Sequence, residues 1–166
     1  MSADTSPGTG TRPVRRVRAV LLAWAAALAA ADLVIKAAAE ALLSDGQVID
    51  LGPVNFRLLY NPGVAFSFGA ALPGWVIVAV TGLIIAALSW YAVSSAPAMG
   101  RVPRTGSTLL LGGAMGNFID RLDGRGVVDY LHTGWFPTFN LADVFVTTGV
   151  VLYALGTLRS APRHGD

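Results

Sequence analysis

Long apolar runs alternate with short polar segments along this chain. Four such runs occur, at about residues 17–39, 75–94, 108–119 and 140–158. A predominantly apolar stretch of about 20 residues is long enough for a helix to cross the hydrocarbon core of a bilayer. The third run is shorter and rich in glycine. The pattern predicts an all-α membrane protein in which four transmembrane helices form one domain, residues 17–158.

A different pattern occupies residues 40–74, between the first two apolar runs. The stretches DGQVIDLG and NFRLLY combine turn residues with β-prone residues, which predicts a small hairpin or curved sheet. Asn61, Pro62 and Gly63 follow, and Gly63 permits a positive φ or a close backbone approach. Asn61 is either a cap or a ligand for a substrate amide. The segment is either part of a site or an ordinary re-entry turn anchored at the membrane interface by the phenylalanines that follow it.

The composition supports a membrane protein and excludes several kinds of site. The chain is 54% hydrophobic and 13% charged, with a net charge of +2 and a mean hydropathy of +0.58. Its basic residues lie in short flanks, so nucleic-acid binding is not expected. There is no cysteine, which excludes disulfides, thiolate metal sites and a cysteine nucleophile. The only histidines are His132 and His164, and no HExxH or Walker motif occurs. No metal or organic cofactor is expected.

The arginines predict the orientation in the membrane. The only lysine among the 12 basic residues is Lys36, so eleven are arginines. Most of them precede the first run, separate the second from the third, or follow the fourth: Arg12, Arg15, Arg16, Arg18, Arg101, Arg104, Arg159 and Arg163. The positive-inside rule then places both termini in the cytoplasm. We expect residues 1–16 to be disordered and residues 159–166 to form a tail. A cleavable signal peptide is the alternative for the first run.

Polar residues within the apolar runs are candidates for function, because ionisable groups at membrane depth are costly. Asp32 and Lys36 are four residues apart on one helix face, which predicts an ion pair that neutralises both charges. A role in holding the helices of the site together is compatible with that pair.

A second polar group follows the glycines of the third run. Gly112 and Gly116 have the GxxxG spacing that allows close helix packing. Asn117, Asp120 and Arg121 come next, at the i, i+3 and i+4 spacing of one helix face. Asp120 and Arg121 are expected to form a local charge pair.

Aspartates remain as the candidate catalytic groups. Two carboxylates held close together share a proton, so that one activates water while the other donates to a carbonyl oxygen. Asp129, in the apolar GVVDYL run, and Asp143, in the first turn of the fourth run, fit this requirement. Asp120 is the rival partner, and Asp123 is expected to be solvated. Asn140 and Asp143 point the same way, and the alternative role of helix cap suits Asn140 better.

Five segments carry a resemblance to a known family. They are Asp32-Leu-Val-Ile-Lys36, Asn61-Pro-Gly-Val-Ala-Phe-Ser67, Gly112-Gly-Ala-Met-Gly-Asn-Phe-Ile-Asp-Arg121, Gly126-Val-Val-Asp129 and Phe139-Asn-Leu-Ala-Asp143. In this order they resemble the bacterial lipoprotein signal peptidases (signal peptidase II). The resemblance covers nearly all of residues 17–158.

The resemblance implies an aspartyl endopeptidase of the bacterial cytoplasmic (inner) membrane, with its active site near the outer face. Such an enzyme removes the signal peptide from diacylglyceryl-modified prolipoproteins by cleaving before the lipidated cysteine, and it binds globomycin-type inhibitors. Asp129 and Asp143 match the catalytic dyad. Substrate-binding positions match Asn61, Gly63, Asn117, Arg121 and Asn140, and supporting positions match Asp32, Lys36 and Asp120. A small extracytoplasmic β-cradle and a monomeric state are also expected.

Two functions of other classes stay open at this point. In a small proton-coupled membrane transporter or channel component, Asp32, Lys36, Asp129 and Asp143 would form a relay. Four helices are few for alternating access, however, and no inverted repeat is evident. In a non-enzymatic assembly subunit, the GxxxG segment would mediate contacts between chains. Replacing the aspartates by asparagine discriminates among these functions.

Overall fold

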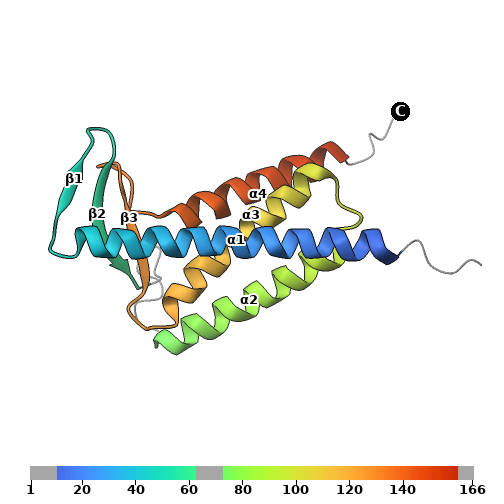
Figure 1. Cartoon of the computed structure of the whole chain (residues 1–166), viewed down its shortest axis with the longest axis horizontal. Helices are drawn as coiled ribbons and strands as arrows, with labels where there is room; N and C mark the ends of the chain where they lie inside the picture. The colour runs from blue at the N-terminus through green and yellow to red at the C-terminus, as the bar shows by residue number, and fades with distance from the viewer. Residues whose placement is uncertain (1–10, 63–72, 161–166) are drawn as a thin grey trace, which may run out of the picture.

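The computed structural model describes residues 11–62 and 73–160. Within these ranges the chain forms four helices and one antiparallel sheet of three strands. The helices are α1 (Thr11–Leu43), α2 (Gly74–Ser95), α3 (Arg101–Arg121) and α4 (Leu141–Ser160), and the strands are β1 (Val48–Asp50), β2 (Asn55–Asn61) and β3 (Val127–His132). The sheet lies at one end of the helices, and the start of α1 and the end of α4 lie at the other end (Figure 1).

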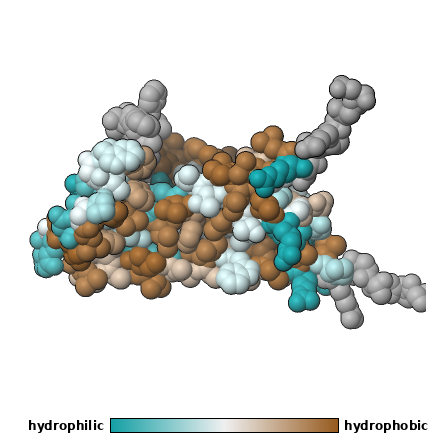
Figure 2. Space-filling model, turned by 90° about the horizontal axis from the view of Figure 1, so that it is seen from above, coloured by the Kyte–Doolittle hydropathy of each residue, from teal (hydrophilic) through white to brown (hydrophobic). Residues whose placement is uncertain are grey.

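Three of the helices are long and apolar enough to cross a membrane, over Pro13–Leu43, Gly74–Ser95 and Leu141–Arg159. Large apolar side chains on the helix surface agree with contact to lipid: Leu83 and Trp90 of α2 are 73% and 75% exposed. Figure 2 shows hydrophobic side chains over the middle of the molecule and hydrophilic ones toward its two ends. Helix α3 is 21 residues long, but it carries charged residues near both ends and does not meet the same criterion.

Two helix starts differ from those expected. Residues 11–16, expected to be disordered, form the first turns of α1. Pro13 is tolerated there because the first turn of a helix does not use its N–H groups. Helix α3 begins at Arg101, although the apolar run begins only near residue 108. The hydropathy pattern marks only the apolar part of a helix. The polar residues before that part belong to the same helix because its backbone hydrogen bonds continue through them.

Helix α3 packs against the other three helices through its glycines. A Cβ atom added at Gly106 would lie 2.5 Å from the backbone nitrogen of Tyr153 in α4. One added at Gly112 would lie 2.7 Å from Leu28 Cβ in α1, and one at Gly116 would meet the Asp32 carboxylate. The expected role of the GxxxG glycines in helix packing is therefore confirmed. This packing brings the polar ends of α1, α3 and α4 together.

The expected hairpin is present, and a third strand extends it. Strand β1 pairs with β2, with Val48 opposite Arg57, and β2 pairs with β3, with Leu59 opposite Asp129. The inner face of the sheet packs on the end of α1 through Ala39, Leu43, Val128 and Tyr130. Asp129 lies between Val128 and Tyr130 in β3, and its carboxylate contacts Asn140 just before α4.

Candidate active site

Asp129 lies at the centre of a polar cluster between the sheet and the helices. Asp129 is only 1% exposed. Both of its carboxylate oxygens accept hydrogen bonds from side-chain amides. Asn61 Nδ2 donates to Oδ2 at 3.0 Å from the neighbouring strand β2. Asn140 Nδ2 donates to Oδ1 at 2.7 Å from the residue before α4. Two different elements therefore fix the orientation of this carboxylate.

Asp143 lies in the first turn of α4 and is held by the same Asn140. The Asn140 Oδ1 accepts the Asp143 N–H at 3.0 Å, and the Asp143 Oδ2 accepts the Asn140 N–H at 3.1 Å. This reciprocal arrangement is a capping box, so both residues take part in the cap. From the sequence, the cap role suited Asn140 better than Asp143. Because Asn140 also donates to Asp129, one side chain connects the two aspartates.

Asn117 in α3 connects this pair to the helix bundle. Its Nδ2 donates to Asp143 Oδ1 at 2.8 Å. Its Oδ1 accepts from Asn140 Nδ2 at 3.1 Å and from Lys36 Nζ at 2.7 Å. The amide can satisfy all three contacts in only one orientation, because a carboxylate must face its nitrogen and a cation its oxygen.

Lys36 is the buried cation beneath the cluster, with only 1% of its surface exposed. Its Nζ lies 2.8 Å from Asp32 Oδ2 and 2.8 Å from Asp120 Oδ2. The expected pair with Asp32 is thus confirmed, and a second acid from α3 joins it. Asp120 pairs with Lys36 and not with Arg121, which corrects the local pair that we expected. Successive residues of a helix point about 100° apart, so Asp120 faces α1 while Arg121 points elsewhere.

The two acids bound to Lys36 also hold backbone groups of the site. Asp32 Oδ1 accepts the N–H of Ala142, in the first turn of α4, at 2.9 Å. Asp120 Oδ2 accepts the N–H of Val128 in β3 at 3.1 Å. The lysine network therefore positions the backbone next to both Asp129 and Asp143.

The remaining candidate residues are Arg121, Asp123 and Gly63. Arg121 Nη1 donates to the Asn117 carbonyl oxygen at 2.7 Å, while its Nε is buried with no partner among the described residues. Asp123 is solvated as expected and bonds Arg125 at 2.7 Å, where both side chains are exposed. Gly63 lies outside the described residues. Within the part of the chain that is described, no three acids or histidines are grouped as a metal site would require.

A cavity of about 710 Å³ opens beside the two aspartates. It is lined by Asn61, Asp129, Phe136, Pro137, Thr138, Phe139, Asp143, Val144, Thr147 and Thr148. The pKa of Asp129 is raised to about 6: burial is the main cause, the hydrogen bond from Asn61 opposes it, and the nearby negative charge of Asp143 adds to it. The cavity therefore contains a carboxyl group that can hold a proton near neutral pH, next to a second carboxyl group.

The family model of signal peptidase (SPase) II matches residues 24–159 of this chain. This chain belongs to the signal peptidase II family. The lipoprotein signal peptidase of Mycobacterium avium (strain 104) is 37% identical over 150 residues, which cover 85% of this chain and 79% of that protein. The lipoprotein signal peptidase of Azoarcus sp. (strain BH72) is 36% identical over 158 residues, covering 91% of this chain and 89% of that one.

Solved structures agree with this membership. A bacterial membrane enzyme determined by the in meso method at 2.3 Å resolution superposes with a TM-score of 0.75 and 25% identity. The match covers 89% of this chain and 93% of that one. A second bacterial membrane enzyme, determined at 1.9 Å resolution, gives a TM-score of 0.73 and 26% identity, with 86% and 95% coverage. The chain therefore shares its fold with bacterial membrane enzymes of known structure.

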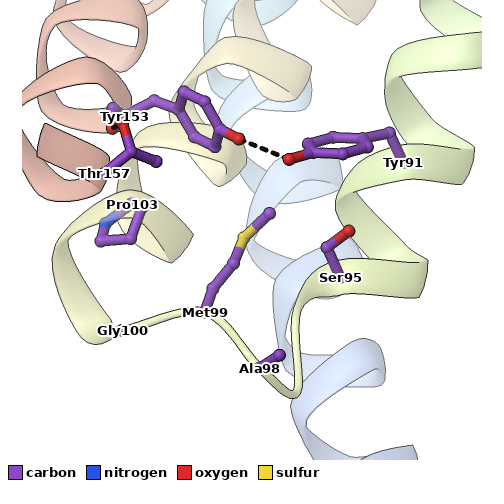
Figure 3. A pocket seen from close by; sticks show the side chains of 8 residues that line it. All are labelled: Tyr91, Ser95, Ala98, Met99, Gly100, Pro103, Tyr153 and Thr157. Atoms are coloured by element: carbon purple, nitrogen blue, oxygen red, sulfur yellow. Dashed lines mark hydrogen bonds between the residues drawn. The ribbon is translucent and has the colours of Figure 1, made fainter. Parts of the chain in front are cut away.

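This signal peptidase II family member has a second cavity, at the end away from the sheet, with a volume of about 310 Å³. The Tyr91 and Tyr153 hydroxyls face each other across it at 2.6 Å and connect α2 to α4 (Figure 3). Its lining is Tyr91, Ser95, Ala98, Met99, Gly100, Pro103, Tyr153 and Thr157, which includes no carboxylate. Of these two cavities, only the first is lined by carboxylates.

The sequence did not identify the walls of the first cavity. Phe136 and Phe139 come from the segment between β3 and α4, and Val144, Thr147 and Thr148 come from α4. The one available signal was the i, i+4 spacing of Asp143 and Thr147, which places both on one helix face.

Proposed function

We propose that this protein is an aspartyl endopeptidase of the bacterial inner membrane that removes the signal peptide from prolipoproteins. The cut falls before a cysteine that already carries a diacylglyceryl group. Membership of the signal peptidase II family supports the substrate class. The single observation that supports the mechanism is that Asn140 hydrogen-bonds both Asp129 and Asp143 beside one cavity.

In the proposed mechanism the two carboxyl groups share one proton. Asp129 holds it, in accord with its raised pKa, and donates it to the carbonyl oxygen of the scissile peptide bond. Asp143, which accepts N–H donors from Asn117 and Asn140, acts as the base that activates water. Water gives a proton to Asp143 and adds to the carbonyl carbon. The C–N bond then breaks as Asp143 passes that proton to the amine of the lipidated cysteine, and the hydroxyl formed from the carbonyl oxygen returns its proton to Asp129.

The remaining candidates take supporting roles in this proposal. Substrate amides bind near Asn61, Gly63, Asn117, Arg121 and Asn140. The ion network of Asp32, Lys36 and Asp120 holds the helix ends in place. The substrate, with its apolar signal helix and acyl chains, reaches the cavity from the lipid phase. Globomycin-type inhibitors compete for the same cavity, and the enzyme acts as a monomer.

The proposed membrane arrangement has four transmembrane helices, with α3 as the fourth. Helix α3 has 21 residues and α2 has 22, and α3 packs against all three other helices. Arginines near the start of α1, the start of α3 and the end of α4 support a cytoplasmic position of these ends, since positive charge is retained on that side. The sheet and both aspartates then lie at the outer face, where the sheet forms a small cradle.

Cleavage of a purified diacylglyceryl prolipoprotein tests this function. We expect Asp129→Asn and Asp143→Asn to abolish cleavage while both variants insert and fold, as judged by size-exclusion chromatography in detergent. The matched control is Asp123→Asn, because that aspartate is exposed in a turn outside the cavity; it should cleave at the wild-type rate. Full processing by either cavity variant would refute the carboxylate pair.

A further inference from the structure

The cavity extends from the aspartates along one face of α4. Asp143 and Thr147 are four residues apart, and Val144 and Thr148 are the next such pair, so all four line the cavity from one side. Thr147 and Thr148 are about 6 and 7.5 Å further along the helix axis than Asp143. Another wall of the cavity is aromatic, with Phe136 near Phe139 at 5.8 Å between ring centroids.

The hydroxyls of Thr147 and Thr148 have no hydrogen-bond partner among the residues that the structure describes. Three other threonines of the helices, Thr105, Thr108 and Thr157, each donate to the carbonyl oxygen four residues earlier, at 2.9–3.0 Å, whereas Thr81 of α2 makes no such bond among the described residues and does not line this cavity. A hydrogen-bond donor without a partner in an apolar environment is costly. The two threonines are exposed, and their free hydroxyls indicate a ligand that supplies hydrogen-bond acceptors.

We propose that Thr147 and Thr148 bind the ester carbonyls of the diacylglyceryl group of the substrate, with its acyl chains along Val144 and the aromatic wall. This inference rests on the proposed function. An ester carbonyl is an acceptor with no donor of its own, so it needs hydroxyls. A signal helix does not need them, because its carbonyls are already paired within the helix. The threonines are thus assigned to the lipid and not to the signal helix.

The position of the threonines agrees with the covalent structure of such a substrate. The glyceryl esters are joined to the cysteine through its sulfur, so they lie several bonds beyond the peptide bond that is cut. With that bond at Asp143, the esters reach one helical turn further along α4, where the two threonines are. Phe136 is 48% exposed and Trp135 next to it is 85% exposed, as suits side chains that meet lipid at the mouth of the cavity.

The test compares two substrates that differ only in the lipid linkage. One carries the natural diacylglyceryl esters, and the other carries a dialkylglyceryl group in which ethers replace the esters. We expect the double variant Thr147→Val with Thr148→Val to lose roughly tenfold in kcat/KM on the ester substrate, mainly through KM, since two hydrogen bonds are removed. On the ether substrate it should equal wild type. Valine keeps the shape of threonine, and Thr147→Ser with Thr148→Ser should restore the preference for the ester.

The matched control is Thr157→Val, whose hydroxyl bonds its own helix at the opposite end of α4; both substrates should be cleaved as by wild type. Equal losses on the two substrates, or no loss on either, would overturn the assignment of the threonines and leave the peptidase function intact. If wild-type enzyme cleaves neither substrate, the proposed function itself fails, and the lipid subsite fails with it.

Discussion

At the scale of single residues, Lys36 has the most demanding environment in the described part of the chain. Its ammonium group is removed from water and contacts three oxygens, from Asp32, Asp120 and Asn117. Desolvation of such a charge is expensive, and two carboxylates offset that cost only while the lysine is present. The three partners come from α1 and α3, and the two acids bind N–H groups of α4 and β3. This lysine therefore affects both stability and the geometry of the site.

We predict that Lys36→Met lowers the free energy of unfolding by about 3–5 kcal/mol, because it leaves two buried carboxylates without a cation. Denaturant unfolding in detergent micelles, followed by tryptophan fluorescence, measures the loss. Arg125→Met is the control, since Arg125 pairs with Asp123 and Glu40 at the surface, where water screens the charges. Losses of equal size in the two variants would contradict the role of the buried network.

The raised pKa of Asp129 predicts a pH dependence. Asp129 must be protonated to donate, so kcat/KM should fall as the pH rises through about 6. Asn61→Ala removes a hydrogen bond that favours the ionised carboxylate, and this further raises the pKa of Asp129. The alkaline limb of the pH–rate profile should then move to higher pH, whatever the variant loses in rate. If the alkaline limb stays at the same pH or moves to lower pH, the assignment of the proton to Asp129 is contradicted.

The same shift has a consequence for stability. A carboxyl group whose pKa is higher in the folded state than in the unfolded state stabilises the fold when it is protonated. For Asp129 this contribution is fully present below about pH 4, the ordinary range of an aspartate, and is lost as the pH rises through about 6. In Asp129→Asn this part of the pH dependence should be absent from thermal unfolding curves.

At the scale of elements, the contact between α3 and α4 sets the position of the first turn of α4. A Cβ atom added at Gly113 would meet the carbonyl oxygen of Ala142 and would lie 3.1 Å from Phe145 Cβ. Ala142 lies between Asn140 and Asp143 in the chain. Close packing at this glycine is therefore coupled directly to the orientation of the capping box and of Asp143.

We predict that Gly113→Ala lowers kcat by about 100-fold, because displacing reacting groups by about 1 Å can have an effect of that size. Cleavage of the prolipoprotein substrate measures it. Gly82→Ala is the control: it lies on α2, and its added Cβ would meet only the Phe118 ring at 3.2 Å, a side chain that can move. The coupling between packing and catalysis would be refuted by a Gly113→Ala enzyme as active as Gly82→Ala.

The sequence predicted elements with a strong local signal and missed those that depend on distant partners. The apolar runs and the β1–β2 hairpin have clear periodicity or turn residues. Strand β3 lies in a short apolar run whose pairing partner, β2, is far away in the chain, so no local pattern distinguishes it. The Asp32–Lys36 pair follows from helical spacing, whereas Asp120 joins it only because α1 and α3 pack together. The walls of the cavity are likewise a product of tertiary packing.

At the scale of the whole molecule, the acidic residues gather at the sheet end, where Arg57, Arg121 and Arg125 also lie. Within residues 11–62 and 73–160, every aspartate and glutamate after Asp32 lies in the outer part of a helix, the sheet or a turn at the sheet end. The opposite end carries arginines at the start of α1, the start of α3 and the end of α4. Positive charge is retained on the cytoplasmic side of a membrane. The sheet end therefore faces outward in the arrangement that we propose.

Whether α3 crosses the membrane can be decided by labelling, because the chain contains no cysteine and single cysteines can be introduced without background. Ala98 precedes α3 and Asp123 follows it, and both are exposed. With four spans, Asp123→Cys should react with a membrane-impermeant maleimide in intact cells, and Ala98→Cys only after permeabilisation. Asp45→Cys, in the turn after α1, serves as the outward control. If α3 does not cross, positions 98 and 123 lie on one side of the bilayer and must label alike, and the aspartates then no longer face the outside.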